Sequence, residues 1–248
     1  MKGTGAAFII LLAADSAAAA ETENSLSGTL TLTSDYRFRG ISQDDGQITP
    51  QAELDWSGPD GWSAGAFASK VDFNDRENTS FELDLFGGRR IELGWGVLDL
   101  EAIYYGYPDH HPSKGSRTYS SWELSGKLTH DWDAWSGSLA ISWSPDFVGN
   151  GAAWDVEAGA ARDITSWLAV SGHAGRQWID RWDRLAHIGF PYSYADIGAT
   201  ATRGRFSLDL RYEVTTLSKT QCLLTEGAPD WCNGGFVLTL TYALGKDG

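Results

Sequence analysis

Apolar and polar residues alternate along almost the whole chain from residue 25 onwards. In the segment 26–38, leucines, Tyr36 and Phe38 fall on one face, and threonines, Asp35 and Arg37 fall on the other. A side-chain period of two is typical of a β-strand whose two faces meet different surroundings. We identify twelve such segments, and an even number is typical of bacterial single-chain membrane barrels. The alternation is weakest in the segment 62–73, where the expected apolar face consists of Gly65, Phe67, Val71 and Phe73.

The connections between these segments are short and long in strict alternation. Tight links fall near residues 58–61, 94–96, 131–133, 163–166 and 204. Longer links fall near residues 39–46, 74–80, 108–117, 145–152, 179–191 and 218–234. Outer-membrane barrels have short periplasmic turns and longer extracellular loops, so this order predicts both chain ends on the periplasmic side. A soluble β-sandwich also alternates in sequence, but it does not require connections of alternating length.

Aromatic residues gather at the ends of the expected strands, where amphipathic rings settle at the headgroup level of a bilayer. The core of a sandwich would instead bury its tryptophans in the middle of the strands. The expected periplasmic belt consists of Trp56, Trp62, Trp95, Trp132, Trp135, Trp167 and Phe206. The expected extracellular belt consists of Tyr36, Phe38, Phe73, Phe81, Tyr104, Trp122, Trp143, Trp154, Trp178, Tyr194 and Phe236.

The first twenty residues have the organisation of an export signal. Lys2 supplies a positive charge, residues 6–14 form an apolar run, and small residues at 17–20 favour cleavage after Ala20. Nine apolar residues are too few to span a bilayer as a helix, and no long apolar run free of charges follows. We therefore expect a signal peptide at 1–20.

These patterns together predict an all-β protein. The expected fold is a transmembrane antiparallel up-and-down β-barrel of about twelve strands, in the outer membrane of a Gram-negative bacterium. The barrel domain is expected at 21–248, with its strands between residues 25 and 244. The negative mean hydropathy of −0.28 agrees with this fold, because only every second residue of a barrel strand meets lipid.

The polar faces of the strands are rich in carboxylates. If the apolar face meets lipid, the polar face lines the lumen, and a water-filled acidic lumen attracts cations and repels anions. An alternative is a plugged lumen in which the acids pair with arginines and hold the barrel in shape. The candidate pore-lining residues are Asp35, Arg37, Glu53, Asp55, Glu82, Asp84, Asp99, Glu101, Glu123, Lys127, Asp155, Glu157, Asp209, Arg211 and Glu213.

Net charge and histidine placement exclude several other functions. A formal charge of −14 at pH 7 argues against nucleic acid, whose phosphates need basic partners. A hydrolase of the Ser–His type needs a histidine beside a serine on neighbouring strands, and His173, expected in the lumen, has no such arrangement evident in sequence. The adjacent His110 and His111 are a weak metal motif. We therefore predict no enzyme activity, no catalytic residue, no metal and no cofactor.

The two cysteines lie close together in the longest outer loop. In an exported protein Cys222 and Cys232 are expected to form a disulfide, which would hold the shape of this loop over the mouth of the barrel. Asp44, Asp45 and Asp109 are expected in solvated outer loops rather than as ligands of divalent cations.

The segment 34–43, SDYRFRGISQ, ends the first expected strand and begins its loop. It resembles the N-terminal signature of the bacterial TorF-type porins, formerly a conserved hypothetical group. The export signal, the mature length and a second strand that opens with Thr49-Pro50-Gln51 are also similar. The resemblance implies an outer-membrane barrel with pore activity and leaves the substrate undefined. The chain departs from the family at its end, because Tyr242 and Leu244 are followed by four further residues instead of a terminal aromatic residue.

The sequence thus predicts a porin-like channel for passive diffusion of small solutes, with an acidic lumen and a weak preference for cations. The alternative is a structural or receptor barrel that conducts nothing. Expected partners are outer-membrane lipid and lipopolysaccharide, the barrel-assembly machinery, and small solutes or ions.

Overall fold

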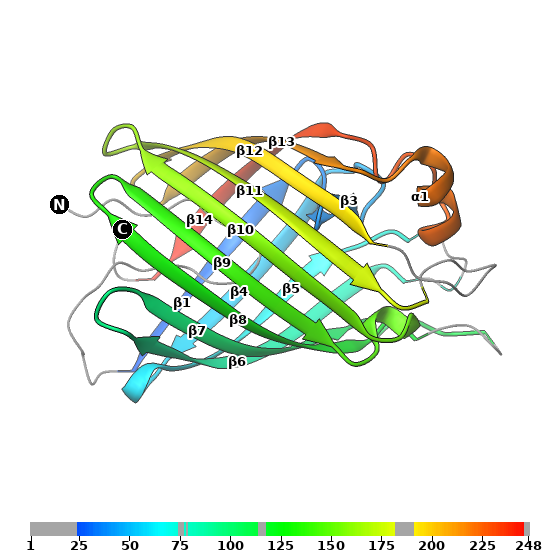
Figure 1. Ribbon diagram of the computed structural model, residues 1–248, viewed down its shortest axis with the longest axis horizontal. Coiled ribbons are helices and arrows are strands. Elements are labelled where there is room, and N and C mark those ends of the chain that lie inside the picture. The colour runs from blue at the N-terminus through cyan, green and yellow to red at the C-terminus, as the bar shows by residue number, and fades with distance from the viewer. Residues whose placement is uncertain (1–23, 74–76, 78, 114–117, 182–190, 246–248) are drawn as a thin grey trace.

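The computed structural model describes residues 24–73, 77, 79–113, 118–181 and 191–245, and in these residues twelve strands form a closed barrel (Figure 1). The expected signal peptide lies outside the described residues. The barrel strands are β1 (Ser25–Thr33), β4 (Thr49–Ser57), β5 (Trp62–Lys70), β6 (Phe81–Glu92), β7 (Val97–Gly106), β8 (Ser121–Trp132), β9 (Trp135–Ser144), β10 (Ala153–Asp163), β11 (Leu168–Ile179), β12 (Tyr192–Arg203), β13 (Phe206–Thr215) and β14 (Gly235–Leu244).

Each barrel strand pairs antiparallel with the next one along the chain, and β1 closes the barrel by pairing with β14. The closing register places Gly28 opposite Leu244 and Thr33 opposite Thr239. Closure leaves no strand edge unpaired, which a bilayer requires because it offers no water to backbone groups. The predicted up-and-down barrel of twelve strands is confirmed.

The two faces of the strands differ as the alternation predicts. Large apolar side chains point outward and stay exposed, for example Leu210 (51%) and Leu238 (48%), while polar side chains on the opposite face are buried. Such a continuous apolar exterior is the lipid-facing surface of a membrane barrel. Trp56, Trp62, Trp122 and Trp154 are among the exposed rings near the strand ends.

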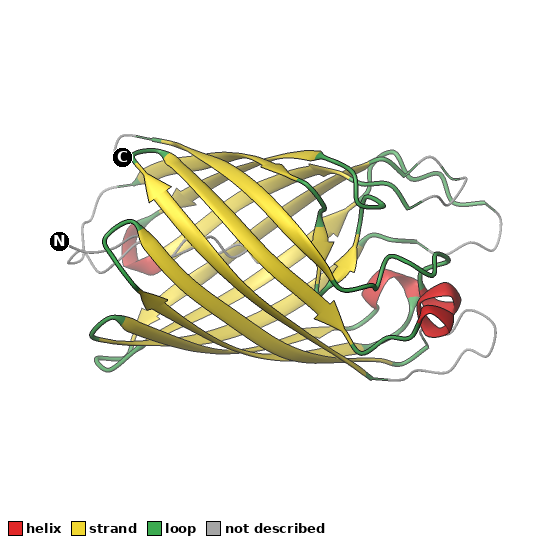
Figure 2. Ribbon diagram, turned by 90° about the horizontal axis from the view of Figure 1, so that it is seen from above, coloured by secondary structure: helices red, strands yellow, loops and turns green. Residues whose placement is uncertain are grey.

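The short turns lie at one end of the barrel and the long connections at the other (Figure 2). The long connections carry a small two-stranded sheet, β2 (Arg37–Phe38) with β3 (Ile41–Ser42), the 3₁₀ turn η2 (Phe147–Gly149) and the helix α1 (Lys219–Thr225). The turn η1 (Pro59–Gly61) lies at the other end. In the described part of the chain, no helix has the length and apolar character needed to cross a membrane.

The apolar face expected for the third segment was wrong. In β5 and just beyond it, Phe67 (5% exposed) and Val71 (0%) lie inside the barrel, and Trp62 (53%) lies outside. The alternation itself is intact, but small alanines occupy most of the outward positions and a large ring occupies an inward one. The ring of Phe67 packs against the ring of Tyr36 inside the lumen, with centroids 6.0 Å apart. The prediction from side-chain size therefore assigned the wrong face of β5 to the lipid.

The prediction of an extracellular belt was also wrong for four residues, which do not lie on the outer surface. Tyr36 and Tyr194 are buried, and Phe38 and Phe73 are half-buried against other rings. The first barrel strand ends at Thr33, so Tyr36 and Phe38 belong to the following loop, which turns into the barrel. Tyr194 lies in phase with the inward residues of β12, because Ile197 on the same strand points outward with 62% exposure.

Candidate functional site

The connection between β1 and β4, residues 34–48, folds back into the barrel, and we call it the inward loop. It includes the short β2–β3 sheet. Its side chains reach strands that are distant along the chain: Arg39 contacts Glu123 in β8, and a Cβ at Gly40 would touch Thr215 in β13. The inward loop therefore crosses the lumen and narrows it.

Hydrogen bonds within the inward loop hold its shape. Asp44 accepts from the backbone N–H of Tyr36 (2.9 Å) and of Gly46 (3.1 Å), and Ser42 Oγ donates to Asp35 (2.7 Å). Short polar side chains that bond to nearby backbone favour compact turns over extended strands. Asp44 is fully buried in this role, so its expected position in a solvated outer loop was wrong.

Arg39 fixes the inward loop to the barrel wall. Its guanidinium donates two parallel hydrogen bonds to the carboxylate of Glu123 at 2.9–3.0 Å and lies 3.5 Å from Asp155. The ring of Phe38 lies 4.7 Å from the guanidinium carbon. The Arg39 side chain is 2% exposed; burial lowers its pKa, but Glu123 and Asp155 outweigh that effect and raise the pKa well above its ordinary value. Arg39 is therefore always charged in this position.

Tyrosines surround the carboxylates that face the inward loop. Tyr194 Oη donates to Asp155 and to Glu157, both at 2.9 Å, and Tyr107 Oη donates to Glu82 at 3.1 Å. Phenolic donors solvate buried carboxylates without adding positive charge. The tyrosine hydroxyls therefore supply hydrogen bonds to these carboxylates in addition to the ion pairs of Arg39.

A second network joins the lumen faces of β11, β12 and β13. Asp196 accepts from His173 Nδ1 (2.9 Å) and pairs with Arg211, which also pairs with Asp209 at 3.2 Å. Arg211 further donates to Ser171 Oγ at 2.9 Å. Arg211 thus pairs with two carboxylates on this side of the lumen, and His173 bonds to one of them, Asp196.

The half of the lumen nearer the short turns carries several carboxylates, with Lys127 opposite Asp99 on the neighbouring strand. Asp99 lies 3.9 Å from Arg90, whereas Glu53, Asp55 and Glu101 form no ion pair among the described residues. Charges without partners in a lumen act on the ions that pass. These three carboxylates are therefore candidates for acting on the ions that pass through this half of the barrel.

The fifteen candidate pore-lining residues fall into three groups. Asp35 and Arg37 do not lie on the first barrel strand, as the sequence analysis expected, but in the inward loop, where they pair with each other at 2.6 Å. The group beside the inward loop consists of Glu82, Asp84, Glu123, Asp155, Glu157 and Glu213. The remaining candidates lie along the strands at other levels: Glu53, Asp55, Asp99, Glu101, Lys127, Asp209 and Arg211.

Sequence reasoning missed Arg39 and the lumen tyrosines. Arg39 was expected in an outer loop, and nothing in the local pattern distinguishes an inward loop from an outward one. Tyr105 could have been found, because it continues the inward phase of Asp99 and Glu101 along β7. Its hydroxyl donates to Glu123 at 3.4 Å.

The predicted disulfide between Cys222 and Cys232 is confirmed, with Cα atoms 5.9 Å apart and both residues buried. The connection that it closes also holds the inward loop from above. The backbone oxygen of Trp231 accepts from the N–H of Ser42 (3.0 Å), and its indole Nε1 donates to Asp45 (2.7 Å). The disulfide thus stabilises a loop that contacts the inward loop directly.

We expect replacement of both cysteines by serine to loosen this outer loop without opening the barrel. A bridge over ten residues stabilises by about 2–4 kcal/mol, chiefly by restraining the unfolded chain. Limited proteolysis between residues 216 and 234 should become faster, while the folded, heat-modifiable band on a gel persists. Equal cleavage rates in the serine variant and the oxidised protein would contradict a restraining role.

Gly40 offers a test of how the inward loop is seated. Its φ is +81°, and a Cβ there would lie 2.7 Å from Thr215 Cγ2 and 3.3 Å from Tyr194 Cβ. Gly40→Ala therefore adds a steric clash to a backbone strain of about 1–3 kcal/mol, and should increase proteolysis of the inward loop. Gly46→Ala is the matched control, since φ is +67° but the Cβ meets open space. Equal effects of the two substitutions would show that Gly40 does not pack against the wall.

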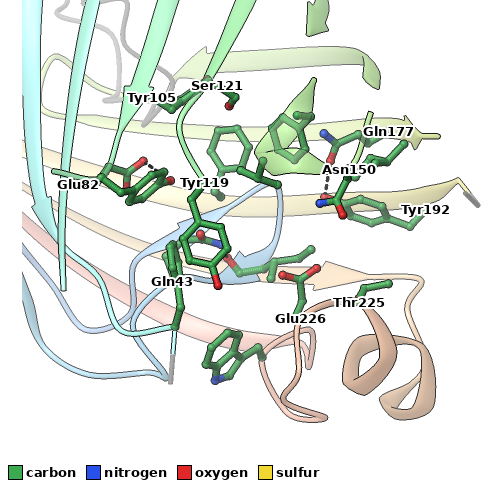
Figure 3. A pocket seen from close by; sticks show the side chains of 18 residues that line it. Gln43, Glu82, Tyr105, Tyr119, Ser121, Asn150, Gln177, Tyr192, Thr225 and Glu226 are labelled. Carbon is green, nitrogen blue, oxygen red and sulfur yellow. Dashed lines mark hydrogen bonds between the residues drawn. The ribbon is translucent and has the colours of Figure 1, made fainter. Parts of the chain in front are cut away.

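Above the inward loop lies a cavity of about 100 Å³, and Figure 3 shows the side chains that line it. The wall combines aromatic rings with a few polar groups, as small-molecule sites generally do. The lining residues are Phe38, Ile41, Gln43, Phe73, Glu82, Tyr105, Tyr107, Tyr119, Ser121, Phe147, Val148, Asn150, Gln177, Ile179, Tyr192, Thr225, Glu226 and Trp231. In the described part of the chain, no group of three or more His, Cys, Asp or Glu side chains is arranged to hold a metal ion.

The family of the chain follows from a match over most of its length. The model of the Gcw_chp family, described as a bacterial protein of unknown function, matches residues 17–241. The chain belongs to this family. No curated protein matches the sequence.

The Gcw_chp chain has the fold of small outer-membrane porins. It resembles the KdgM porin with a TM-score of 0.55 and 4% identity, covering 87% of this chain and 98% of that one. It resembles the NanC porin with a TM-score of 0.53 and 9% identity, covering 90% of this chain and 100% of the NanC chain. It resembles the COG4313 outer membrane channel from Pseudomonas putida F1 with a TM-score of 0.51 and 9% identity, covering 88% of this chain and 94% of that channel. At these identities the likeness concerns the fold.

Proposed function

We propose that this protein is an outer-membrane channel for the passive diffusion of small solutes, with a weak preference for cations. The observation that supports it best is a closed twelve-stranded barrel whose polar interior is narrowed by one inward loop. Twelve strands lie between small barrels filled by side chains and sixteen-stranded porins that hold a water channel. A single loop across such a lumen leaves a narrow path rather than a wide one.

The charge of the lumen supports the proposed preference. Of the fifteen candidate pore-lining residues, twelve are carboxylates and three are cationic. Rings of carboxylates favour cations in pores of this kind. One solved structure of similar fold is the KdgM porin in complex with disordered oligogalacturonate. We do not expect a polyanion of that type to pass here, because the acidic lumen would repel it.

The surroundings of the barrel follow from the same proposal. The apolar exterior would contact outer-membrane lipid and lipopolysaccharide. Assembly machinery would read the last strand, β14, in which Tyr242 and Leu244 would serve as the signal.

The alternative is a barrel that conducts nothing and serves as a structural element or receptor. The specific observation in its favour is the seating of Arg39, which ties the inward loop to Glu123 and Asp155 across the lumen. A plug of this kind would close the barrel if the remaining space admitted no hydrated ion.

Conductance of the purified protein in a planar bilayer distinguishes the two. We expect discrete current steps and, under a potassium chloride gradient, a reversal potential with the sign of cation preference. The preference should be stronger at 0.1 M than at 1 M salt, because the Debye length falls from about 10 Å to about 3 Å. Absence of steps would overturn the channel, and a reversal potential of the anionic sign would overturn the preference.

A further inference from the structure

The cavity above the inward loop contains buried polar atoms that have no hydrogen-bond partner. Among the described residues these are Glu82 Oε2, Ser121 Oγ and Gln177 Nε2, and all three residues line the cavity. The three residues are between 1% and 4% exposed. Buried polar groups are nearly always paired, so three orphans around one space point to something that occupies it.

The charge of this wall has one sign. Glu82 Oε1 accepts a hydrogen bond from Tyr107 Oη at 3.1 Å, and Glu82 Oε2 has no hydrogen-bond partner. Asp84 does not line the cavity but lies two residues along the same strand, and its buried Oδ1 also has no hydrogen-bond partner. Both side chains point to the same face of β6. No lysine, arginine or histidine is among the residues that line the cavity in the described part of the chain.

Aromatic rings form the rest of the enclosure. Eight of the lining residues are aromatic, and Tyr119 and Phe73 pack edge to face with centroids 5.2 Å apart. Phe73 also packs against Tyr107, at 5.4 Å. Ring faces carry partial negative charge and attract cations, most strongly where the site excludes water. A neutral apolar ligand would use the rings but would leave the carboxylate oxygen unpaired.

We propose that this cavity binds a small organic ammonium ion on its way into the lumen. The ammonium group lies against the aromatic rings and pairs with Glu82. Gln177 Nε2 and Ser121 Oγ bond to a polar substituent, such as a hydroxyl, at the other end of the ligand. The inference rests on the proposed function, because a diffusing solute must reach the cavity from the extracellular end. It names the solute class that the channel would select.

Calorimetric titration of the detergent-solubilised folded protein with choline tests the proposal. The matched control ligand is 3,3-dimethylbutan-1-ol, which has the same shape without the charge. Choline should bind at least about fivefold more tightly than this alcohol, as expected for a cation enclosed by rings. Equal affinities would mean an apolar cavity only. Binding of glucose in preference to choline would indicate a neutral saccharide. Either result would overturn the proposal.

Two pairs of variants distinguish a loss of binding caused by the named residues from a loss of binding caused by misfolding. Glu82→Gln keeps the shape and should weaken choline binding about tenfold, while Glu92→Gln, on an exposed residue at the other end, should leave it unchanged. Tyr107→Phe keeps the ring and should bind choline far better than Tyr107→Leu. Heat-modifiable migration on a gel checks that each variant is folded. Unchanged binding in Glu82→Gln would overturn the assignment.

The titration does not depend on conductance, so the two proposals fail separately. A protein that binds choline but gives no current steps in a bilayer would retain this site and lose the channel. A protein that gives cation-selective steps but does not bind choline would retain the channel and lose this site.

Discussion

Replacement of Arg39 by alanine is expected to release the inward loop and to raise single-channel conductance. The substitution leaves Glu123 and Asp155 buried without their cationic partner. Breaking a buried ion pair by removing one partner costs about 3–5 kcal/mol. Such a cost shifts the equilibrium between the seated and released loop by a factor of about a hundred or more. The lumen should therefore widen, and its cation preference should grow because one positive charge is lost.

Planar-bilayer recordings of the purified variant measure both effects. Arg176→Ala is the matched control, since Arg176 is an exposed arginine on the barrel exterior that rests on the ring of Trp178. A double variant, Arg39→Ala with Glu123→Gln, should recover part of the seating, because replacing both partners leaves fewer buried charges unpaired. Unchanged conductance in Arg39→Ala would show that Arg39 does not control the opening.

Neutralisation of Glu53, Asp55 and Glu101 together is expected to abolish most of the cation preference. These carboxylates form no ion pair among the described residues, so neutralising them removes lumen charge without breaking an ion pair. The reversal potential under a salt gradient should move towards zero, and conductance at low salt should fall. At 1 M salt the change should be small, because charges are then screened within about 3 Å.

A triple neutralisation outside the lumen controls for net charge. Glu92→Gln, Asp131→Asn and Asp163→Asn remove the same charge from exposed positions near the short turns. This variant should keep the reversal potential of the unmodified protein. If both triple variants shifted it equally, the selectivity would come from the overall surface field and not from the lumen.

These predictions concern different parts of one arrangement. The inward loop sets how wide the path is, the cavity above it contacts solutes at the extracellular end, and the acids below act on what has passed. Two buried carboxylates of the lumen differ in their partners. Glu123 pairs with Arg39, whereas Glu82 has no cationic partner among the described residues.

The sequence by itself determined the barrel. The alternation of strand faces is a local property with a period of two. The outward position of Leu30 and the inward position of Thr31 can therefore be predicted from neighbouring residues alone. Loop length and the spacing of Cys222 and Cys232 are equally local, and the long and short connections and the disulfide were predicted from them. Where side-chain size misled, as at Phe67, the period was still correct and only the face was reversed.

Only the tertiary structure decided what fills the lumen. Arg39 meets Glu123 across 84 positions of sequence, and Tyr192 Oη donates to the backbone oxygen of Arg39 across 153. No local pattern distinguishes a loop that turns inward from one that extends into solvent, because both are polar and rich in turn residues. The seating depends on partners supplied by β8, β10 and β12, and these come together only when the barrel closes. The cavity and its unpaired carboxylate follow from the same closure.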